Sequence, residues 1–293
     1  MAADSVLRVL VATDGSAPAK AAVAAVVRFP WPAHTHVQGI ITTQARADYG
    51  RPILPAALDR GASLIALNAR RALSQRWPGA DVIVVDKAPV AGILHAAGRF
   101  DADVIALGWR GHGAVRRFLM GSVSRGVVRG ARCAVLVVRR RQRGVHEVVI
   151  GFDGSAHAQR AVELVGRLLP PRGGRVTVFT AVDRMAVPSQ ALVPRGVRAT
   201  VAAEVRRINA ERAARAKRDA ARAARTLTRA GWRARTVKTA GEPLHGLLAT
   251  VDSTGADLLV VGARGTSGVR HLLLGSVAEG ALNRCTVPLL VVR

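Results

Sequence analysis

The sequence predicts an α/β protein with two tandem halves, each built on a doubly wound, open, parallel sheet of five strands. Three observations predict this fold. Short apolar runs alternate with alanine-rich stretches along the 293 residues. The order of these runs is the same in both halves, and one glycine-rich motif occurs in each. Runs that are apolar on both faces suit a parallel sheet covered by helices, and their alternation with helices makes right-handed crossovers the default.

The first half contains five apolar runs bounded by glycine, proline or charged residues, as buried strands are. The predicted strands are Leu7–Ala12, Val37–Ile41, Val82–Val85, Val104–Leu107 and Ala134–Val138. The stretches between them are predicted to be helical. These helices are Ala17–Arg28, Leu58–Arg76, Pro89–Arg99 and Ser122–Arg129.

The second half repeats this order with one longer helix. Its predicted strands are Val148–Ile150, Val176–Thr180, Arg233–Val237, Leu258–Val261 and Val287–Val292. Its predicted helices are Ala156–Leu169, a long helix within Arg198–Ala230, Pro243–Ser253 and Ser276–Leu282. We expect Gly231 to end the long helix as a C-terminal cap.

Constant offsets between matched residues indicate that the halves arose by duplication. The run Asp14-Gly15-Ser16 recurs 139 positions later as Asp153-Gly154-Ser155, whereas Gly108 recurs 154 positions later as Gly262. The difference predicts an insertion of 15 residues in the second half, within the connection that contains the longest helix.

The domain boundary is expected at the charged run Arg139–Gly144, which gives domains of 1–143 and 144–293. Cys133 and Cys285 lie 152 positions apart, just ahead of the last strand of each half. Since the glycine loops are 154 positions apart, this spacing predicts that the second half lacks two residues between its last helix and its last strand. Two cysteines make no disulfide framework, so both are expected to be buried free thiols.

The net charge of +25 comes from 44 Lys and Arg against 19 Asp and Glu, a balance that attracts polyanions. The basic residues are spread along the chain, however, and one Tyr with five Phe gives no stacking signature for nucleic acid. We therefore expect a solvated arginine-rich surface, and nucleic acid is disfavoured as a partner. No apolar stretch approaches the roughly 20 residues of a membrane span, and no secretion signal is evident, so the expected location is cytoplasmic.

The glycine motif carries the chemistry of the chain. It comprises residues 108–111 and 121–122, and it recurs at 262–265 and 275–276. Each copy follows a predicted strand, where glycine permits positive φ and lets phosphate oxygens approach backbone N–H groups. The helix after each copy offers free N–H groups and a positive dipole end. The serine that opens this helix can cap it or bond a phosphate.

Competing motifs are absent from the sequence. There is no Gly-x-x-x-x-Gly-Lys-Ser/Thr loop, and neither glycine loop completes Gly-x-Gly-x-x-Gly after a first strand. His-Glu-x-x-His, paired Cys-x-x-Cys and Gly-x-Ser-x-Gly are also missing. The sequence therefore disfavours a P-loop enzyme, a dinucleotide-binding enzyme, a zinc site and a serine hydrolase.

Both halves resemble the universal stress protein family in the tandem-domain form common in actinobacteria. The resemblance rests on Gly-x2-Gly-x9-Gly-Ser in each half and on the first-strand segments Val11–Ser16 and Ile150–Ser155. It implies the Rossmann-like fold of the adenine nucleotide alpha hydrolases, in two domains packed as a pseudo-dimer. In the ATP-binding branch of this family, the glycine loop holds the phosphates and ribose, and the end of the second strand meets adenine.

The resemblance implies two ATP sites, with Mg²⁺ as a companion of the phosphates. The first site would comprise Ala12, Asp14, Thr42, Gly108, Arg110, Gly111, His112, Gly113, Gly121, Ser122 and Val123. The second would comprise Gly151, Asp153, Ala181, Gly262, Arg264, Gly265, Thr266, Gly268, Gly275, Ser276 and Val277. Asp14 and Asp153 can equally cap the helices that follow them. The difference between His112 and Thr266 predicts unequal affinities.

The leading functional hypothesis is an ATP-binding regulator of the stress response whose protein partners the sequence does not identify. Slow ATP hydrolysis is an alternative, in which Arg110 and Arg264 would contact phosphates. No carboxylate or histidine recurs in both loops as a base, so binding is favoured over turnover. Nucleic-acid binding is a third hypothesis, and it predicts a steep loss of affinity with added salt.

The resemblance also implies that the last strands, Ala134–Val138 and Val287–Val292, pair with each other and make one chain equivalent to a dimer. Edge strands this apolar would otherwise invite aggregation. Pro288 lacks an N–H donor, so the pairing is expected to be partial. Association of two chains into a homodimer is left open.

Overall fold

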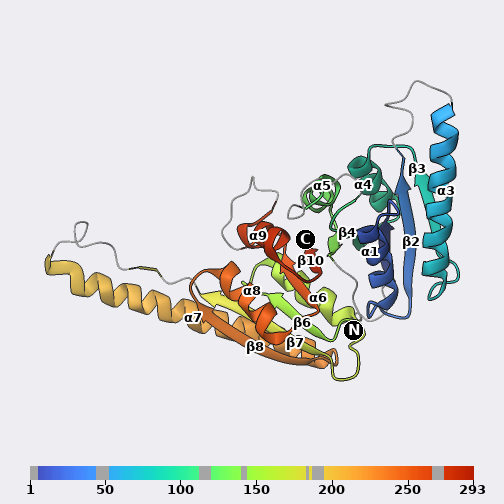
Figure 1. Ribbon diagram of the computed structural model, residues 1–293. Coiled ribbons are helices and arrows are strands. Elements are labelled where there is room, and N and C mark those ends of the chain that lie inside the picture. Colours follow the sequence, from blue (N-terminus) through green and yellow to red (C-terminus); the bar gives the residue numbers. More distant parts are fainter. Residues whose placement is uncertain are drawn as a thin grey trace.

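One ten-stranded sheet with helices on both faces forms the framework of the molecule (Figure 1). The computed structural model describes residues 6–43, 53–111, 120–139, 144–182, 185–186, 195–265 and 274–293. The first half consists of β1 (Leu7–Ala12), α1 (Ala17–Arg28), β2 (Thr35–Thr42), α3 (Ile53–Ser74), β3 (Asp81–Val85), α4 (Pro89–Arg99), β4 (Val104–Gly108), α5 (Ser122–Gly130) and β5 (Ala134–Val138). The second consists of β6 (Glu147–Gly151), α6 (Ala156–Arg167), β7 (Arg175–Val182), the 3-10 turn η1 (Arg195–Val197), α7 (Arg198–Arg229), β8 (Arg233–Ala240), α8 (Pro243–Thr254), β9 (Leu258–Gly262), α9 (Ser276–Arg284) and β10 (Leu289–Val292).

The strand order is β3-β2-β1-β4-β5-β10-β9-β6-β7-β8, so the second half mirrors the first. Strands within each half are parallel, which confirms the predicted α/β class. The two predicted five-stranded sheets are joined into one sheet, because β5 and β10 pair antiparallel. The predicted pairing of the last strands is thereby confirmed. It removes two apolar edges from solvent.

Two layers of helices bury the two faces of the sheet. Helices α1, α3, α6 and α7 share one apolar cluster with the sheet, and α4, α5, α8 and α9 share the other. Strand β5 shows the alternation directly: Leu136 belongs to the first cluster, and its neighbours Val135 and Val137 belong to the second. Burying such a side chain contributes about 1.5–3 kcal/mol.

A pseudo-twofold axis passes through the pair of Leu136 and Leu290, which face each other where β5 meets β10. These two residues are 154 positions apart, as are the glycine loops. The offset therefore persists to the end of the chain, and the predicted loss of two residues before the last strand is wrong. The residue 154 positions after Cys133 is Val287, which is therefore its structural equivalent. Cys285 lies two positions earlier in the second half.

Two arginines bridge the halves in a reciprocal manner. Arg139, after β5, donates to the carbonyl oxygen of Leu282 in α9 at 2.5 Å. Arg293, after β10, donates to the carbonyl oxygen of Val128 in α5 at 2.8 Å. Donors and acceptors are each 154 positions apart, so the pseudo-twofold axis relates the two bonds. Each half thus stabilises a helix end of the other.

Helices α5 and α9 meet across the same axis through unlike side chains. Glu279 of α9 lies 3.7 Å from Arg125 and 3.0 Å from Arg129 of α5, and Arg125 also donates to Asn283. Arg125 and Glu279 occupy equivalent positions, as do Arg129 and Asn283. Pairing α5 with a second copy of itself would place arginine against arginine. The charges therefore favour pairing between the two different halves.

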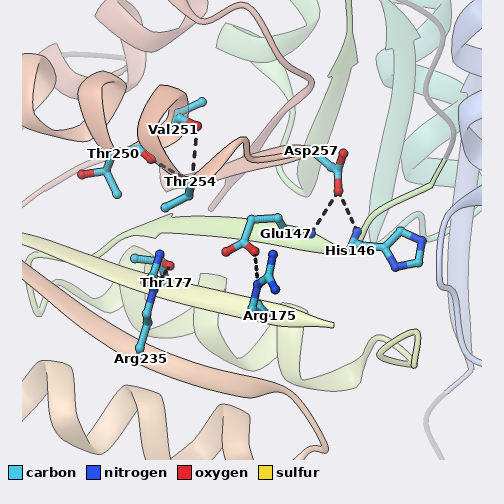
Figure 2. Close-up of polar contacts among 9 residues, drawn as sticks. All are labelled: His146, Glu147, Arg175, Thr177, Arg235, Thr250, Val251, Thr254 and Asp257. Atoms are coloured by element: carbon cyan, nitrogen blue, oxygen red, sulfur yellow. Dashed lines mark hydrogen bonds and ion pairs between the residues drawn. The ribbon is translucent and has the colours of Figure 1, made fainter. Parts of the chain in front are cut away.

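Carboxylates fix the entry of the central strand in each half. Asp257 accepts hydrogen bonds from the backbone N–H groups of His146 and Glu147 at 2.9 and 3.0 Å, and the carboxylate of Glu147 pairs with Arg175 of β7 (Figure 2). Asp103 accepts the equivalent bond at the start of β1. These bonds hold the start of β6 next to β9 and β7. Because the three strands are parallel, their carboxyl ends lie together at the opposite edge of the sheet.

The predicted insertion lengthens the connection between β7 and β8. Helix α7 has 32 residues where α3 has 22, and its N-terminal part projects beyond the sheet (Figure 1). Its C-terminal part packs on β7, β8 and α6, where Ala220, Ala223 and Leu227 are buried. The middle of α7 consequently lies over the carboxyl ends of the strands.

Candidate functional site

An Asp-Gly-Ser turn follows the first strand of each half, at residues 14–16 and 153–155. Its glycine has a φ of 78° in the first half and 80° in the second, in the left-handed region that favours glycine. Its serine caps the next helix by accepting from a backbone N–H at 3.3 or 3.2 Å. Its aspartate accepts from the backbone N–H of this serine at 2.9 or 3.0 Å. The caps are therefore Ser16 and Ser155, and the reading of the aspartates as caps is wrong.

The first glycine of each loop is required by packing. A Cβ on Gly108 would lie 2.7 Å from the backbone of Pro18, and one on Gly262 would lie 2.9 Å from the backbone nitrogen of Ala158. The start of the following helix therefore lies directly against the strand end. Neither glycine, nor the described glycines at 111, 121, 265 and 275, has positive φ. The sequence argument from positive φ was wrong for the described glycines of this motif.

The second glycine of each loop brings its backbone against the aspartate of the Asp-Gly-Ser turn. A Cβ on Gly265 would lie 2.6 Å from Oδ2 of Asp153, and a Cβ on Gly111 would overlap Oδ2 of Asp14. The aspartate uses Oδ1 within its own turn and directs Oδ2 toward the glycine loop. Each glycine loop is thus held next to one carboxylate.

The third glycine closes the loop at the start of a helix. Gly121 donates to Trp109 at 3.0 Å, Gly275 donates to Ala263 at 2.8 Å, and each occupies the N-cap position without a side-chain cap. The serine that follows is the first helical residue, so its expected role as a cap is wrong. Its hydroxyl remains available beside the N–H groups of the first turn.

A cavity of about 750 Å³ lies over the carboxyl ends of β6, β7 and β9. Its floor includes Gly151, its glycine-loop side includes Gly262, Gly265 and Gly275, and α9 contributes Ser276. The apolar part of its wall comes from β7, β9 and α8, with Phe179, Val261 and Leu247. This volume lies within the range of about 300–1,000 Å³ typical of ligand pockets.

The equivalent cavity in the first half measures about 140 Å³. Ile65 of α3 lies over the Asp-Gly-Ser turn, where a Cβ on Gly15 would be 2.9 Å from its Cδ1. The residue 154 positions later is Asp219 of α7, whose Oδ2 would be 3.7 Å from a Cβ on Gly154. The side chain at this helix position therefore lies closer to the turn in the first half than in the second.

The model of the universal stress protein family matches residues 6–139 and again residues 144–293. The chain belongs to the universal stress protein family. Since the model matches twice, this universal stress protein has the tandem form, and its two halves make an intramolecular pseudo-dimer. The resemblance inferred from the glycine motifs is confirmed.

Curated relatives carry the same family name. A universal stress protein from Mycobacterium tuberculosis is 29% identical over 205 residues, which cover 66% of this chain and 62% of that protein. The match thus spans less than two thirds of this relative. Another, from Thermus aquaticus, is 36% identical over 134 residues, or 45% of this chain and 97% of that protein. The crystal structure of a universal stress protein from Archaeoglobus fulgidus has a TM-score of 0.66 at 20% identity, covers 98% of both chains, and shares the fold.

The second cavity of the universal stress protein brings together all the predicted site residues that the structure describes there. These are Gly151, Asp153, Ala181, Gly262, Arg264, Gly265, Gly275, Ser276 and Val277. In the first half, the smaller cavity is lined by Ala12, Asp14, Thr42, Gly108, Arg110, Gly111 and Val123, and not by Gly121 or Ser122. His112, Gly113, Thr266 and Gly268 lie outside the described residues.

Sequence reasoning missed the contribution of α7 to the second cavity. Arg212, Arg215, Ala216 and Asp219 line it, and the arginines of this helix had been assigned to the solvated surface. The offset of 154 could have found the two arginines, because it aligns Arg212 and Arg215 with Leu58 and Gly61 of α3.

Charged groups distinguish the two loops further. The guanidinium groups of Arg110 and Arg139 both stack on the ring of Trp109, each 4.0 Å from its centroid, whereas the second half has Ala263 at this position. Beside the second loop, burial and the charges of neighbouring arginines lower the pKa of His157. Its Nδ1 is buried without a hydrogen-bond partner among the described residues. The neutral form of the His157 imidazole is thereby favoured.

Among the described helices, none combines the length and apolar character needed to cross a membrane.

Proposed function

We propose that this universal stress protein binds ATP in its second half and acts as a nucleotide-dependent regulator of the stress response. The cavity over β6, β7 and β9 is the observation that supports the proposal most directly, because it joins a glycine loop, a helix N-terminus and an apolar wall. Ligands of open parallel sheets bind outside the carboxyl ends of the strands, where the strand order reverses. In the second half this point lies between β6 and β9.

The phosphates would bind at the start of α9. The first N–H groups of this helix have no intrahelical acceptor, and its positive dipole end attracts anions. Ser276 adds a hydroxyl at this position, and Arg264 lies in the adjacent loop. Mg²⁺ would enter with the phosphates, and Asp153 is the carboxylate that lies against this loop. The described residues contain no group of three or more side chains that could hold a metal by themselves.

The nucleoside would occupy the rest of the cavity. Phe179, Leu247 and Val261 form an apolar wall suited to a planar base. The end of β7 at Ala181 offers backbone groups, which supply hydrogen bonds to a base without depending on the side chain. This position is where the sequence expectation places the contact with adenine.

We propose binding in preference to turnover. Phosphoryl transfer needs a group that orients the attacking water and positive charge placed on the transferred phosphate. Asp153 is engaged by the N–H of Ser155, and the second carboxylate of the cavity, Asp219, is replaced by Ile65 in the first half. The arrangement supports a nucleotide held as a signal.

The first half is the weaker candidate. Its cavity of about 140 Å³ falls below the usual range for ligand pockets. The expectation of two sites of unequal affinity stays a prediction, and the second site is the one expected to fill first.

Isothermal titration calorimetry with ATP tests the proposal. The variant Arg264→Ala with Ser276→Ala should weaken ATP binding by about tenfold or more, since each removes a contact to phosphate. Arg284→Ala is the matched control, because it removes one arginine from the opposite end of α9. An absence of measurable ATP binding to the wild-type protein would overturn the proposal.

A further inference from the structure

The lining that α7 adds to the second cavity is more basic than its first-half counterpart. Arg212 and Arg215 line the cavity, whereas Leu58 and Gly61 stand at the positions 154 residues earlier. Over its whole length α7 has ten basic and three acidic residues, against three basic and one acidic in α3. The two halves therefore differ in charge as well as in cavity volume.

We infer that the second half selects an adenine nucleotide that carries an additional phosphate on its ribose, and that Arg212 and Arg215 bind this phosphate. The inference rests on the proposed function and defines its ligand more narrowly. Both residues would distinguish this nucleotide from one without a phosphate on its ribose.

The two arginines are placed to act together. They are three positions apart on one helix, so they lie on the same face about one turn from each other. Arg215 stands 3.7 Å from Asp219 through its Nε, and 82% of its side chain is exposed. Arg212 has no ion-pair partner among the described residues. Guanidinium groups bind phosphate through two parallel N–H donors, which gives the contact geometric specificity.

Arg215 lies one turn from Asp219, whose Oδ2 would be 3.7 Å from a Cβ on Gly154, so this part of α7 borders the turn that follows β6. The glycine loop follows β9, and α7 follows β7, with β6 between the two strands. Neighbouring strands are about 4.8 Å apart, so about 10 Å separates these two strands at the level of the sheet. Phosphates held at the start of α9, after β9, and a base against β7 would leave the ribose over β6, next to this part of α7. A phosphate bound by Arg212 and Arg215 therefore belongs on the ribose.

The charge balance of the cavity agrees with a second anionic group. The lining has three arginines, Arg212, Arg215 and Arg264, against the carboxylates of Asp153 and Asp219. Without the two arginines of α7, the lining would be net negative next to a polyphosphate. The first-half cavity has one arginine and one aspartate, Arg110 and Asp14.

Calorimetry with three commercial nucleotides tests the inference: adenosine 5′-monophosphate, adenosine 2′,5′-bisphosphate and adenosine 3′,5′-bisphosphate. At least one bisphosphate should bind about tenfold more tightly than the monophosphate at about 0.15 M salt, the difference expected for one charge-assisted contact. Comparison of the two bisphosphates identifies the ribose hydroxyl concerned. The variant Arg212→Ala with Arg215→Ala should lose this preference.

Arg218→Ala with Arg222→Ala is the matched control, since it removes the same charge from exposed positions of α7 that do not line the cavity. It should keep the preference, which separates a specific contact from a general attraction to a basic helix. Equal binding of all three nucleotides, or a preference that survives in the Arg212 and Arg215 variant, overturns the inference while the proposed function stands. If neither ATP nor any of the three binds, both fail.

Discussion

Removing Leu290 from the centre of the sheet should destabilise both halves together. Leu290 and its partner Leu136 are 1% and 0% exposed and lie in one apolar cluster where β5 meets β10. A buried Leu→Ala change costs about 2–5 kcal/mol, and this site is covered by helices and bordered by strands on both sides. We expect Leu290→Ala to lower the free energy of unfolding by about 3 kcal/mol. The midpoint of thermal unfolding should fall by about 5 °C.

The decisive assay is a double-mutant cycle by urea denaturation. Leu136→Ala should cost a similar amount, and the double variant should deviate from additivity by about 0.5 kcal/mol or more because the two cavities merge. Leu10→Ala provides the control: it is fully buried but lies on β1, three strands from β10, and should add to Leu290→Ala without coupling. Strict additivity of Leu136 and Leu290, or two separate unfolding transitions of which one is unchanged, would refute the account of a single cooperative sheet.

Three further predictions concern the interface and two partly buried titratable groups, His157 and Cys133. Glu279→Arg replaces two ion pairs with repulsion from Arg125 and Arg129, and should destabilise the fold by about 1 kcal/mol at low salt, with less effect at 1 M salt; an unchanged urea midpoint at low salt would contradict this. Burial and neighbouring arginines lower the pKa of His157, so the unfolded chain takes up the proton first as the pH falls below about 6.5 and stability declines there. His157→Gln should flatten this decline in a pH series, and parallel profiles would show the reasoning to be wrong. Burial raises the pKa of Cys133 to about 11, so iodoacetamide at pH 8 should label the native thiol about a hundredfold more slowly than the unfolded one, as followed by mass spectrometry; similar rates would exclude the shift.

The fold could be predicted from the sequence because each strand is a short apolar run between breakers. Every predicted strand is present, and the internal repeat placed the insertion in the connection that holds α7. The pairing of β5 with β10 was predicted from the family resemblance, because no local sequence pattern specifies which edge strands pair. The repeat gave a wrong alignment at Cys133 and Cys285, which are identical residues 152 positions apart. The pairing of Leu136 with Leu290 shows that the true offset there is 154.

The candidate site was predicted in outline, and its errors have physical causes. The strand ends and glycine loops follow from local sequence, so their residues gather at both cavities. The reason for the glycines was misjudged, because close approach to Pro18 or Asp153 arises only when distant segments pack. Arg215 looked like a surface residue because helical periodicity shows which face is polar and does not show that a cavity lies beneath that face.

Native mass spectrometry with ATP tests the central claim most directly. The account predicts a complex with one ATP per chain at low micromolar nucleotide, which Arg264→Ala with Ser276→Ala weakens and Arg284→Ala retains. A chain that stays free of ATP at millimolar nucleotide would contradict it.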